Sequence, residues 1–207
     1  MTRIKDALDA VAEAIYEQKD YLTNLDAKTG DGDHGVNMSR GFAAVQEAVD
    51  EMADTTKPGP VLETIGRTLI ENVGGAAGPL YGIAFVRAGQ ACDDDTRLCI
   101  KDIEKLLTAA IDAIQKRGRA AKGDKTMLDV LIPLRDCFLP ENAEGKKLND
   151  CLLDGLRAVN EGLQYTTTIA ARKGRASLIG ERGIGYEDPG AASSAVMYRA
   201  LYRYLRY

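Results

Sequence analysis

Three aspartates with the spacing of metal ligands lie near the start of the chain: Asp26, Asp31 and Asp33, in the segment LDAKTGDGDHGVN. Carboxylates this close repel one another unless a cation neutralises them. Their hard oxygen atoms suit Mg²⁺ or Ca²⁺, and the intervening glycines permit a tight backbone path. The spacing lacks the final glutamate of an EF-hand loop. Because Mg²⁺ commonly completes its shell with water and phosphate oxygens, the cluster predicts a site for a metal–nucleotide complex.

A local role for the same residues remains open at this point. Asp31 and Asp33 are residue types that form turns and begin helices. His34 is the only histidine of the chain. A lone histidine is more often a structural or capping group than a catalyst, but its place beside two aspartates makes it a candidate site residue. Asn37 follows one turn later and can hold a phosphate oxygen or cap a turn.

The segment GGAAGP, at residues 74–79, is the second candidate. Its glycines let a ligand approach the backbone, and Pro79 is favoured at the first position of a helix. The free N–H groups of such a helix start suit a phosphate. The alternative is a tight corner between two helices. The segment at residues 74–79 is not a Walker A loop, because no GK[ST] follows.

Two further connections carry charge. The segment KGDKT, at residues 122–126, places Asp124 or Thr126 as an N-cap, which favours a structural role. Residues 172–190, RKGRASLIGERGIGYEDPG, are basic and rich in glycine. A long loop of this kind is uncommon in a compact domain unless it has a function, although a solvated run of charge is the alternative. Asp188, Pro189 and Gly190 are expected to cap the last helix.

These segments join helices. Ile4, Leu8, Val11, Ala12 and Ile15 repeat at steps of three and four residues, which indicates one apolar helix face. Similar patterns occupy residues 36–52, 61–73, 83–91, 100–114, 127–138, 148–171 and 191–205. No run of alternating β-branched residues predicts a strand. We therefore predict an all-α, antiparallel up-and-down bundle of about eight helices.

The order of the connections places them together. Alternate loops of an antiparallel bundle lie at the same end, and the four polar connections follow the first, third, fifth and seventh predicted helices. One composite site at one end of the bundle is therefore expected. No Ser-His-Asp spacing, Cys-His pair or protein-kinase motif is present. Aspartates for a metal, glycine loops for phosphates and arginine for developing charge together predict phosphoryl transfer.

The bulk composition agrees with one globular domain over residues 1–207, of which 45% are hydrophobic and 28% charged. A net charge of −4 argues against a general nucleic-acid or anionic-membrane binder. The four cysteines form no CxxC pair, and with one histidine a zinc site is not expected. The charged N-terminal segment is neither a signal peptide nor a membrane span, so a cytoplasmic protein with reduced thiols is expected.

Four motifs together resemble one family, the nucleotide-binding L subunit (DhaL) of dihydroxyacetone kinase. They are LDxxxGDxDHGxNM at 25–38, GGAxGPLxG at 74–82, GDKTMxDV at 123–130 and ARKGRASxxGERxIGxxDPGA at 171–191. The resemblance covers nearly the whole chain. It implies an eight-helix antiparallel barrel with the nucleotide in the loops at one end.

The resemblance also implies the site residues. Two Mg²⁺ would be held by Asp26, Asp31 and Asp33, and ADP or ATP would be contacted by His34, Gly35, Val36, Asn37, Ala76, Ala77, Gly118, Met127, Arg175, Asp188, Pro189 and Gly190. Arg175 is the candidate catalytic residue that stabilises the transferring phosphate. The family often has serine at the position of Ala77, where this chain retains only a backbone N–H for phosphate.

The family further implies partners. A separate K subunit holds dihydroxyacetone covalently, and the L subunit delivers the γ-phosphoryl group to it. The length of the chain leaves no room for a K part, so a stand-alone subunit is expected. In phosphotransferase-linked systems an M subunit carrying a phosphohistidine rephosphorylates the bound ADP, whereas other members exchange free ATP.

Three alternatives remain at the level of sequence. An L subunit of an ATP-dependent tetrulose kinase of the erythrulose type would have the same site. So would a nucleotide-sensing module that docks onto a transcription factor. A purely structural helical bundle is the third.

Overall fold

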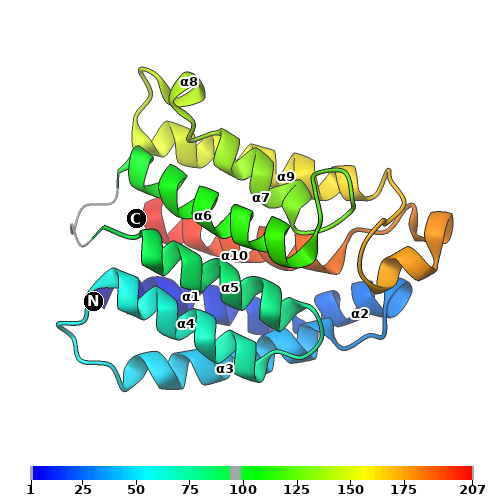
Figure 1. The fold of residues 1–207 in the computed structure, drawn as a ribbon, viewed down its shortest axis with the longest axis horizontal. Helices are drawn as coiled ribbons and strands as arrows, with labels where there is room; N and C mark the ends of the chain where they lie inside the picture. The colour runs from blue at the N-terminus through cyan, green and yellow to red at the C-terminus, as the bar shows by residue number, and fades with distance from the viewer. Residues whose placement is uncertain (1, 94–98, 207) are drawn as a thin grey trace.

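The computed structural model describes residues 2–93 and 99–206, and within these residues the regular structure is entirely helical (Figure 1). The helices are α1 (Thr2–Glu17), α2 (Lys19–Thr29), α3 (His34–Asp50), α4 (Pro58–Asn72), α5 (Ala77–Ala91), α6 (Ile100–Gly118), α7 (Leu128–Asp136), α8 (Pro140–Ala143), α9 (Leu148–Thr166) and α10 (Pro189–Arg206). Two short 3₁₀ helices, η1 (Arg175–Leu178) and η2 (Gly180–Gly183), precede α10.

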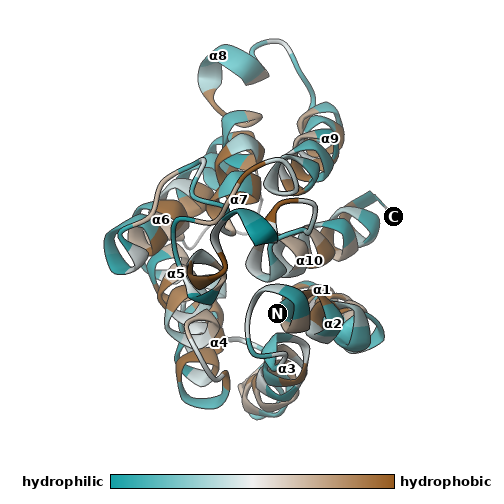
Figure 2. Cartoon of the chain, turned by 90° about the vertical axis from the view of Figure 1, so that its right-hand side faces the viewer, coloured by the Kyte–Doolittle hydropathy of each residue, from teal (hydrophilic) through white to brown (hydrophobic). Residues whose placement is uncertain are grey.

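The long helices form a closed ring. Helices α3, α4, α5, α6 and α7 each pack against the next, α7 packs on α9, α9 on α10, and α10 returns to α1, which packs on α3 (Figure 2). Counting α1 with α2 as one segment and leaving out the single-turn α8 gives eight members. Since each neighbour in the chain is also a neighbour in space, the antiparallel all-α prediction is confirmed.

Apolar side chains fill the ring. The largest buried ones are Phe42, Phe138, Ile15, Leu22, Met38, Leu69, Ile111, Ile114 and Leu128. They come from six different helices and from the end of α7, so the apolar stripes of the sequence turn toward one common core. Burial of each such side chain stabilises the fold by about 1.5–3 kcal/mol. No helix of the described residues is long and apolar enough to cross a membrane.

Helices α4 and α5 approach each other closely because Gly66 and Gly82 face each other at the contact. A Cβ atom on Gly66 would lie 2.5 Å from the carbonyl oxygen of Gly82, and one on Gly82 would lie 2.6 Å from that of Gly66. Any larger residue would push the two backbones apart. This contact fixes α5, whose first turn borders the site described below.

The first predicted helix, from the apolar pattern of residues 4–15, corresponds to α1, and the structure adds a second helix, α2, before the carboxylate turn. The chain departs from helical geometry at Gln18 (φ −96°, ψ 8°), and α2 then runs to Thr29. Asp26 therefore lies on a helix, one turn before the glycine-rich turn, rather than within a loop. That placement gives the first metal-ligand candidate a rigid support.

Two other helix ends differ from the pattern. The predicted segment 148–171 ends at Thr166, where three consecutive threonines turn their hydroxyls onto the backbone three residues earlier. Such bonds compete with continued helix formation. Helix α5 begins at Ala77 rather than Pro79. Pro79 is its third residue, where a missing N–H still costs no helical bond.

The four polar connections gather at one end of the ring, on the right in Figure 1 and facing the viewer in Figure 2. They are the turns before α3 and α5, the turn between α6 and α7, and the long segment between α9 and α10. The bundle thus supplies a frame that brings four segments distant in sequence to one place.

Candidate functional site

All four connections border one cavity of about 420 Å³. The first contributes the three aspartates and His34, and the second contributes residues 74–77. The turn before α7 contributes Lys125, Thr126 and Met127. The segment before α10 contributes residues 173–176 and 188–190. Ile114, Arg117 and Gly118, near the end of α6, complete the wall.

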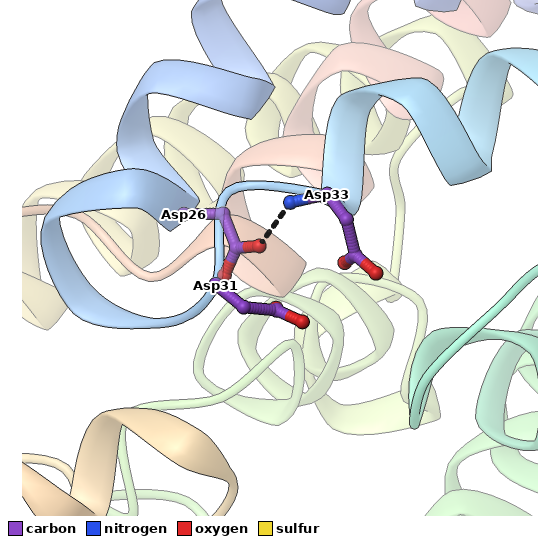
Figure 3. Close-up of side chains that lie close together, drawn as sticks. All are labelled: Asp26, Asp31 and Asp33. Atoms are coloured by element: carbon purple, nitrogen blue, oxygen red, sulfur yellow. Dashed lines mark hydrogen bonds between the residues drawn. The ribbon is translucent and has the colours of Figure 1, made fainter.

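The aspartates form a compact group on one wall. Asp26, Asp31 and Asp33 each offer a carboxylate oxygen, and these atoms lie within 4.8 Å of one another (Figure 3). Asp26 accepts the backbone N–H groups of Asp33, at 2.9 Å, and of His34, at 3.2 Å. A Cβ atom on Gly30 would lie 2.2 Å from Oδ1 of Asp26, so any larger residue would displace this carboxylate.

The three carboxylates are arranged in a way that suits a metal ion. Asp33 precedes α3 but its side chain does not cap the helix, which leaves its carboxylate directed at the cavity with that of Asp31. The local interpretation predicts turn formers and a helix cap, but the side chain of Asp33 makes no cap bond and the oxygen atoms of Asp31 and Asp33 converge. Three hard oxygen donors in one small space fit Mg²⁺.

Arg175 reaches the aspartates from the opposite wall. The guanidinium, at the start of η1, forms an ion pair with the carboxylate of Asp31. Its side chain is 58% exposed, so the pair adds little to stability in water. Lys173 and Arg117 border the same cavity. The cavity therefore has an acidic wall facing a basic one, which suits a metal–phosphate complex.

Three helices begin at the cavity: α3 at His34, α5 at Ala77 and α10 at Pro189. Helix N-termini carry partial positive charge and free N–H groups. Asp26 occupies those of α3, and Asp188 caps α10 by accepting the N–H of Ala191 at 2.8 Å. No side chain caps α5, whose first turn also contains no acidic residue.

His34 is held in a buried polar cluster behind the aspartates. Its Nε2 lies 2.9 Å from Oγ of Ser193, and that hydroxyl lies 2.7 Å from the hydroxyl of Tyr81. Tyr81 also donates to the carbonyl of Gly190 at 2.8 Å. Burial lowers the pKa of His34, although Asp26 and the neighbouring Asp33 oppose the shift. The cluster joins the starts of α3 and α10.

Asp188 lies at the base of the basic segment. Burial raises the pKa of its carboxyl to about 7, against the opposing effects of its hydrogen bond from Ala191 and the charge of Lys125. Its backbone N–H donates to Oγ1 of Thr166 at 3.1 Å. The predicted cap of the last helix is confirmed by the bond to Ala191.

The structure brings nine of the twelve predicted nucleotide contacts to the cavity, namely His34, Ala76, Ala77, Gly118, Met127, Arg175, Asp188, Pro189 and Gly190. Gly35, Val36 and Asn37 lie outside the cavity lining. Gly35 packs against α2, where a Cβ would lie 2.0 Å from the carbonyl of Lys19. Val36 is exposed, and Asn37 is buried and accepts a hydrogen bond from Arg40 at 2.9 Å.

The sequence did not single out four residues that border the cavity: Thr29, Leu80, Ile114 and Arg117. Leu80 and Ile114 belong to apolar helix stripes that indicate core, and nothing in the pattern marks their cavity ends. Lys125 stands inside a recognised motif, but the motif alone does not tell which way its side chain turns.

The helices and connections that form the cavity lie within a segment that matches a known protein family. Residues 28–203 match the model of the DAK2 domain. The matched segment runs from the carboxylate turn to the last helix, so the chain belongs to the DAK2-domain family.

Within this family, the chain is similar to one class of kinase subunit. The chain is 38% identical over 200 residues to the ADP-binding subunit DhaL of a PEP-dependent dihydroxyacetone kinase from Escherichia coli, covering 97% of this chain and 95% of that protein. It is 40% identical to a subunit of the same description from Listeria innocua, covering 94% and 91%. Within the DAK2-domain family, the chain is thus a relative of the DhaL subunits.

The fold also matches a solved structure. The dihydroxyacetone kinase of C. freundii, in complex with AMP-PNP and Mg²⁺, aligns with a TM-score of 0.78 at 24% identity. The match covers 98% of this chain and 34% of that one. This likeness establishes the helical architecture.

Proposed function

We propose that this chain is the nucleotide-binding subunit of a multi-subunit dihydroxyacetone kinase, and that its whole length is one DhaL-type domain. The observation that carries the proposal is the meeting of three converging aspartates and Arg175 across one cavity. The names of the E. coli and L. innocua relatives support ADP as the nucleotide and dihydroxyacetone as the acceptor.

Asp26, Asp31 and Asp33 would hold two Mg²⁺. Bound there, Mg²⁺ would neutralise charge on the phosphates. The bonds from Asp33 and His34 to Asp26 hold that carboxylate in place. Ligand oxygens that are fixed before binding lose little freedom when the ion arrives.

The remaining walls suit the rest of the nucleotide. The uncapped start of α5 offers the N–H groups of Ala76 and Ala77 to phosphate oxygens. Leu80, Ile114 and Met127 give the cavity an apolar side that suits a purine ring. Gly118 borders the same region, where a Cβ atom would lie 3.4 Å from the side chain of Leu80.

The γ-phosphoryl group would pass to a hydroxyl oxygen of dihydroxyacetone held by a separate K subunit. The bond to the β–γ bridging oxygen breaks as the new P–O bond forms, and the hydroxyl proton leaves to a base on that partner. Arg175 is partly exposed at the mouth and would stabilise the charge of the transferring group. His34 is buried and bonded to Ser193, so it is poorly placed to bind a substrate covalently.

We favour the phosphotransferase-linked form, in which an M subunit rephosphorylates ADP in place, because both relatives are described as PEP-dependent. The names of these relatives give no support to docking onto a transcription factor.

The test combines binding with transfer. Isothermal titration should give tight binding of ADP with Mg²⁺ and a large loss of affinity when EDTA replaces the metal. The protein, mixed with a K subunit, an M subunit and the phosphoenolpyruvate-fed phosphocarrier chain, should phosphorylate dihydroxyacetone. Binding without transfer to dihydroxyacetone or erythrulose would refute the kinase function and leave a nucleotide sensor. Failure to bind ADP would refute both.

A further inference from the structure

Lys125 has an unusual environment for a lysine at a candidate phosphate site. It is fully buried, and its backbone adopts the left-handed conformation at φ 60°. Its Nζ donates to four backbone carbonyls: those of Thr166 at 2.6 Å, Ile169 at 3.2 Å, Gly183 at 2.8 Å and Tyr186 at 2.7 Å. An ammonium group has three donors, so these four acceptors occupy all of them.

This arrangement excludes direct contact between Lys125 and a phosphate. A lysine in a loop that borders a phosphate site commonly contacts the phosphate directly. The Nζ of Lys125 has no donor left for a ligand, and its side chain has no exposed surface. If the ammonium group of Lys125 moved to a ligand, the four carbonyls would remain buried without hydrogen-bond donors, which costs free energy. Lys125 therefore acts on the protein rather than on the nucleotide.

The four carbonyls come from the two ends of the connection between α9 and α10. Thr166 is the last residue of α9, and Ile169 follows it. A cation is favoured at this end because the final carbonyls of a helix lack partners and carry partial negative charge. Gly183 and Tyr186 stand at the base of the segment that carries Arg175. Lys125 thus ties the base of that segment to the end of α9.

Neighbouring bonds reinforce the same junction. The N–H of Gly185 donates to the carbonyl of Thr167 at 2.8 Å, and the N–H of Arg172 donates to that of Asp124 at 3.0 Å. Asp129 is buried and holds the turn around Lys125 by accepting the N–H groups of Gly123 and Thr126. Burial lowers the pKa of Lys125, and the nearby charge of Asp188 opposes this shift.

The tip of the segment is held differently. Within the described residues, the hydrogen bonds of residues 174–182 stay inside residues 174–184, and the ion pair of Arg175 with Asp31 is their polar link to the rest of the bundle. The position of Arg175 therefore depends on the base of the segment, which Lys125 fixes.

We propose that Lys125 is a positioning residue for phosphoryl transfer, which acts by anchoring the Arg175 segment to the end of α9. The proposal rests on the proposed kinase function for its effect on transfer. Its structural half, the anchoring of residues 172–187, is independent of that function.

The main variant is Lys125→Met, which keeps the length of the side chain and removes its donors. Lys122→Met is the matched control, because Lys122 is an exposed lysine in the same connection. Hydrogen–deuterium exchange should quicken in residues 172–187 of Lys125→Met, with α1 and α4 unchanged. The control should exchange like the wild type. Unchanged exchange in residues 172–187 would overturn the proposal.

Transfer kinetics test whether the effect runs through Arg175. Lys125→Met should lower kcat about a hundredfold, the size expected for a small misplacement of a reacting group, with a much smaller change in ADP affinity. When Lys125→Met is added to Arg175→Ala, kcat should fall less than about threefold further, because the guanidinium that Lys125 positions is already absent. An equal fractional loss in both backgrounds would show a general structural role and overturn the proposal.

If Lys125→Met does not fold, Lys125→Gln, whose amide keeps two donors, replaces it in both experiments. If neither variant folds, Lys125 supports the whole bundle and the proposal is wrong. If the wild type transfers no phosphoryl group, the kinase function fails, while the exchange experiment still decides whether Lys125 anchors the segment.

Discussion

The two charged walls of the cavity are built by different means. The acidic turn is stabilised by bonds between residues close in the chain, since Asp26 accepts N–H groups seven and eight residues away. The basic segment is anchored by bonds from Lys125 to Gly183 and Tyr186, 58 and 61 residues away. One wall is thus a local structure and the other a product of tertiary packing.

This difference has consequences for sequence change. A short loop closed by its own residues loses little chain entropy and depends on few neighbours. The basic segment keeps its position only when α6, α7 and α9 are correctly packed around Lys125. Variants in the acidic turn should therefore act on the metal directly, whereas variants in the basic segment should act on the position of Arg175.

The largest effect is expected from Arg175→Ala. Removal of the guanidinium should lower kcat for phosphoryl transfer about a thousandfold, as for other arginines that stabilise a transferring phosphate. ADP affinity should change far less, because the arginine acts on the charge of the transition state. The measurement is steady-state transfer with a K subunit, alongside titration with Mg²⁺ and ADP.

Arg182→Ala is the matched control for Arg175→Ala. Arg182 lies in the same segment, is exposed and does not border the cavity. Its loss should leave transfer nearly unchanged. Equal losses of kcat and ADP affinity in Arg175→Ala would make that residue a ground-state clamp and remove its catalytic role.

The acidic wall is tested by Asp26→Ala, compared with Asp20→Ala on an exposed position of the same helix. Asp26→Ala should weaken Mg²⁺-dependent ADP binding about a hundredfold, because it removes a ligand and frees the N–H groups of Asp33 and His34. Asp20→Ala should bind normally. ADP affinity that is unchanged in Asp26→Ala would exclude the predicted metal site.

The smallest effect concerns pH and the base of the basic segment. Burial raises the pKa of Asp188 to about 7, so the folded protein holds this proton at pH values where the unfolded chain has lost it. The stability contributed by the protonated carboxyl should therefore fall as pH rises from about 4 to about 7. Asp188→Asn keeps an acceptor for the helix cap and removes the titration.

The measurement is urea unfolding of both proteins at pH 5, 6 and 7. The free energy of unfolding of the wild type should decrease relative to that of Asp188→Asn across this series. A constant difference between the two proteins would show that Asp188 titrates outside this range.

Much of this architecture was predictable. Apolar residues at steps of three and four report the inward face of each helix, and alternation of direction then places alternate connections at one end. The helix break at Gln18 was not predictable, because no proline or glycine marks it. Nor was the end of α9 at Thr166, where side-chain bonds to the backbone outweigh the apolar pattern.

The amino-acid sequence alone predicts the helical ring, the end at which the polar connections gather and the local turn that brings Asp31 and Asp33 beside Asp26. Each of these follows from periodicity or from short-range geometry. Tertiary structure decided which residues reach the cavity. It placed Gly35 against α2 and Asn37 against Gly74, and it turned the ammonium group of Lys125 toward four carbonyls. Those carbonyls come from distant segments, so only the packed bundle brings them to one lysine.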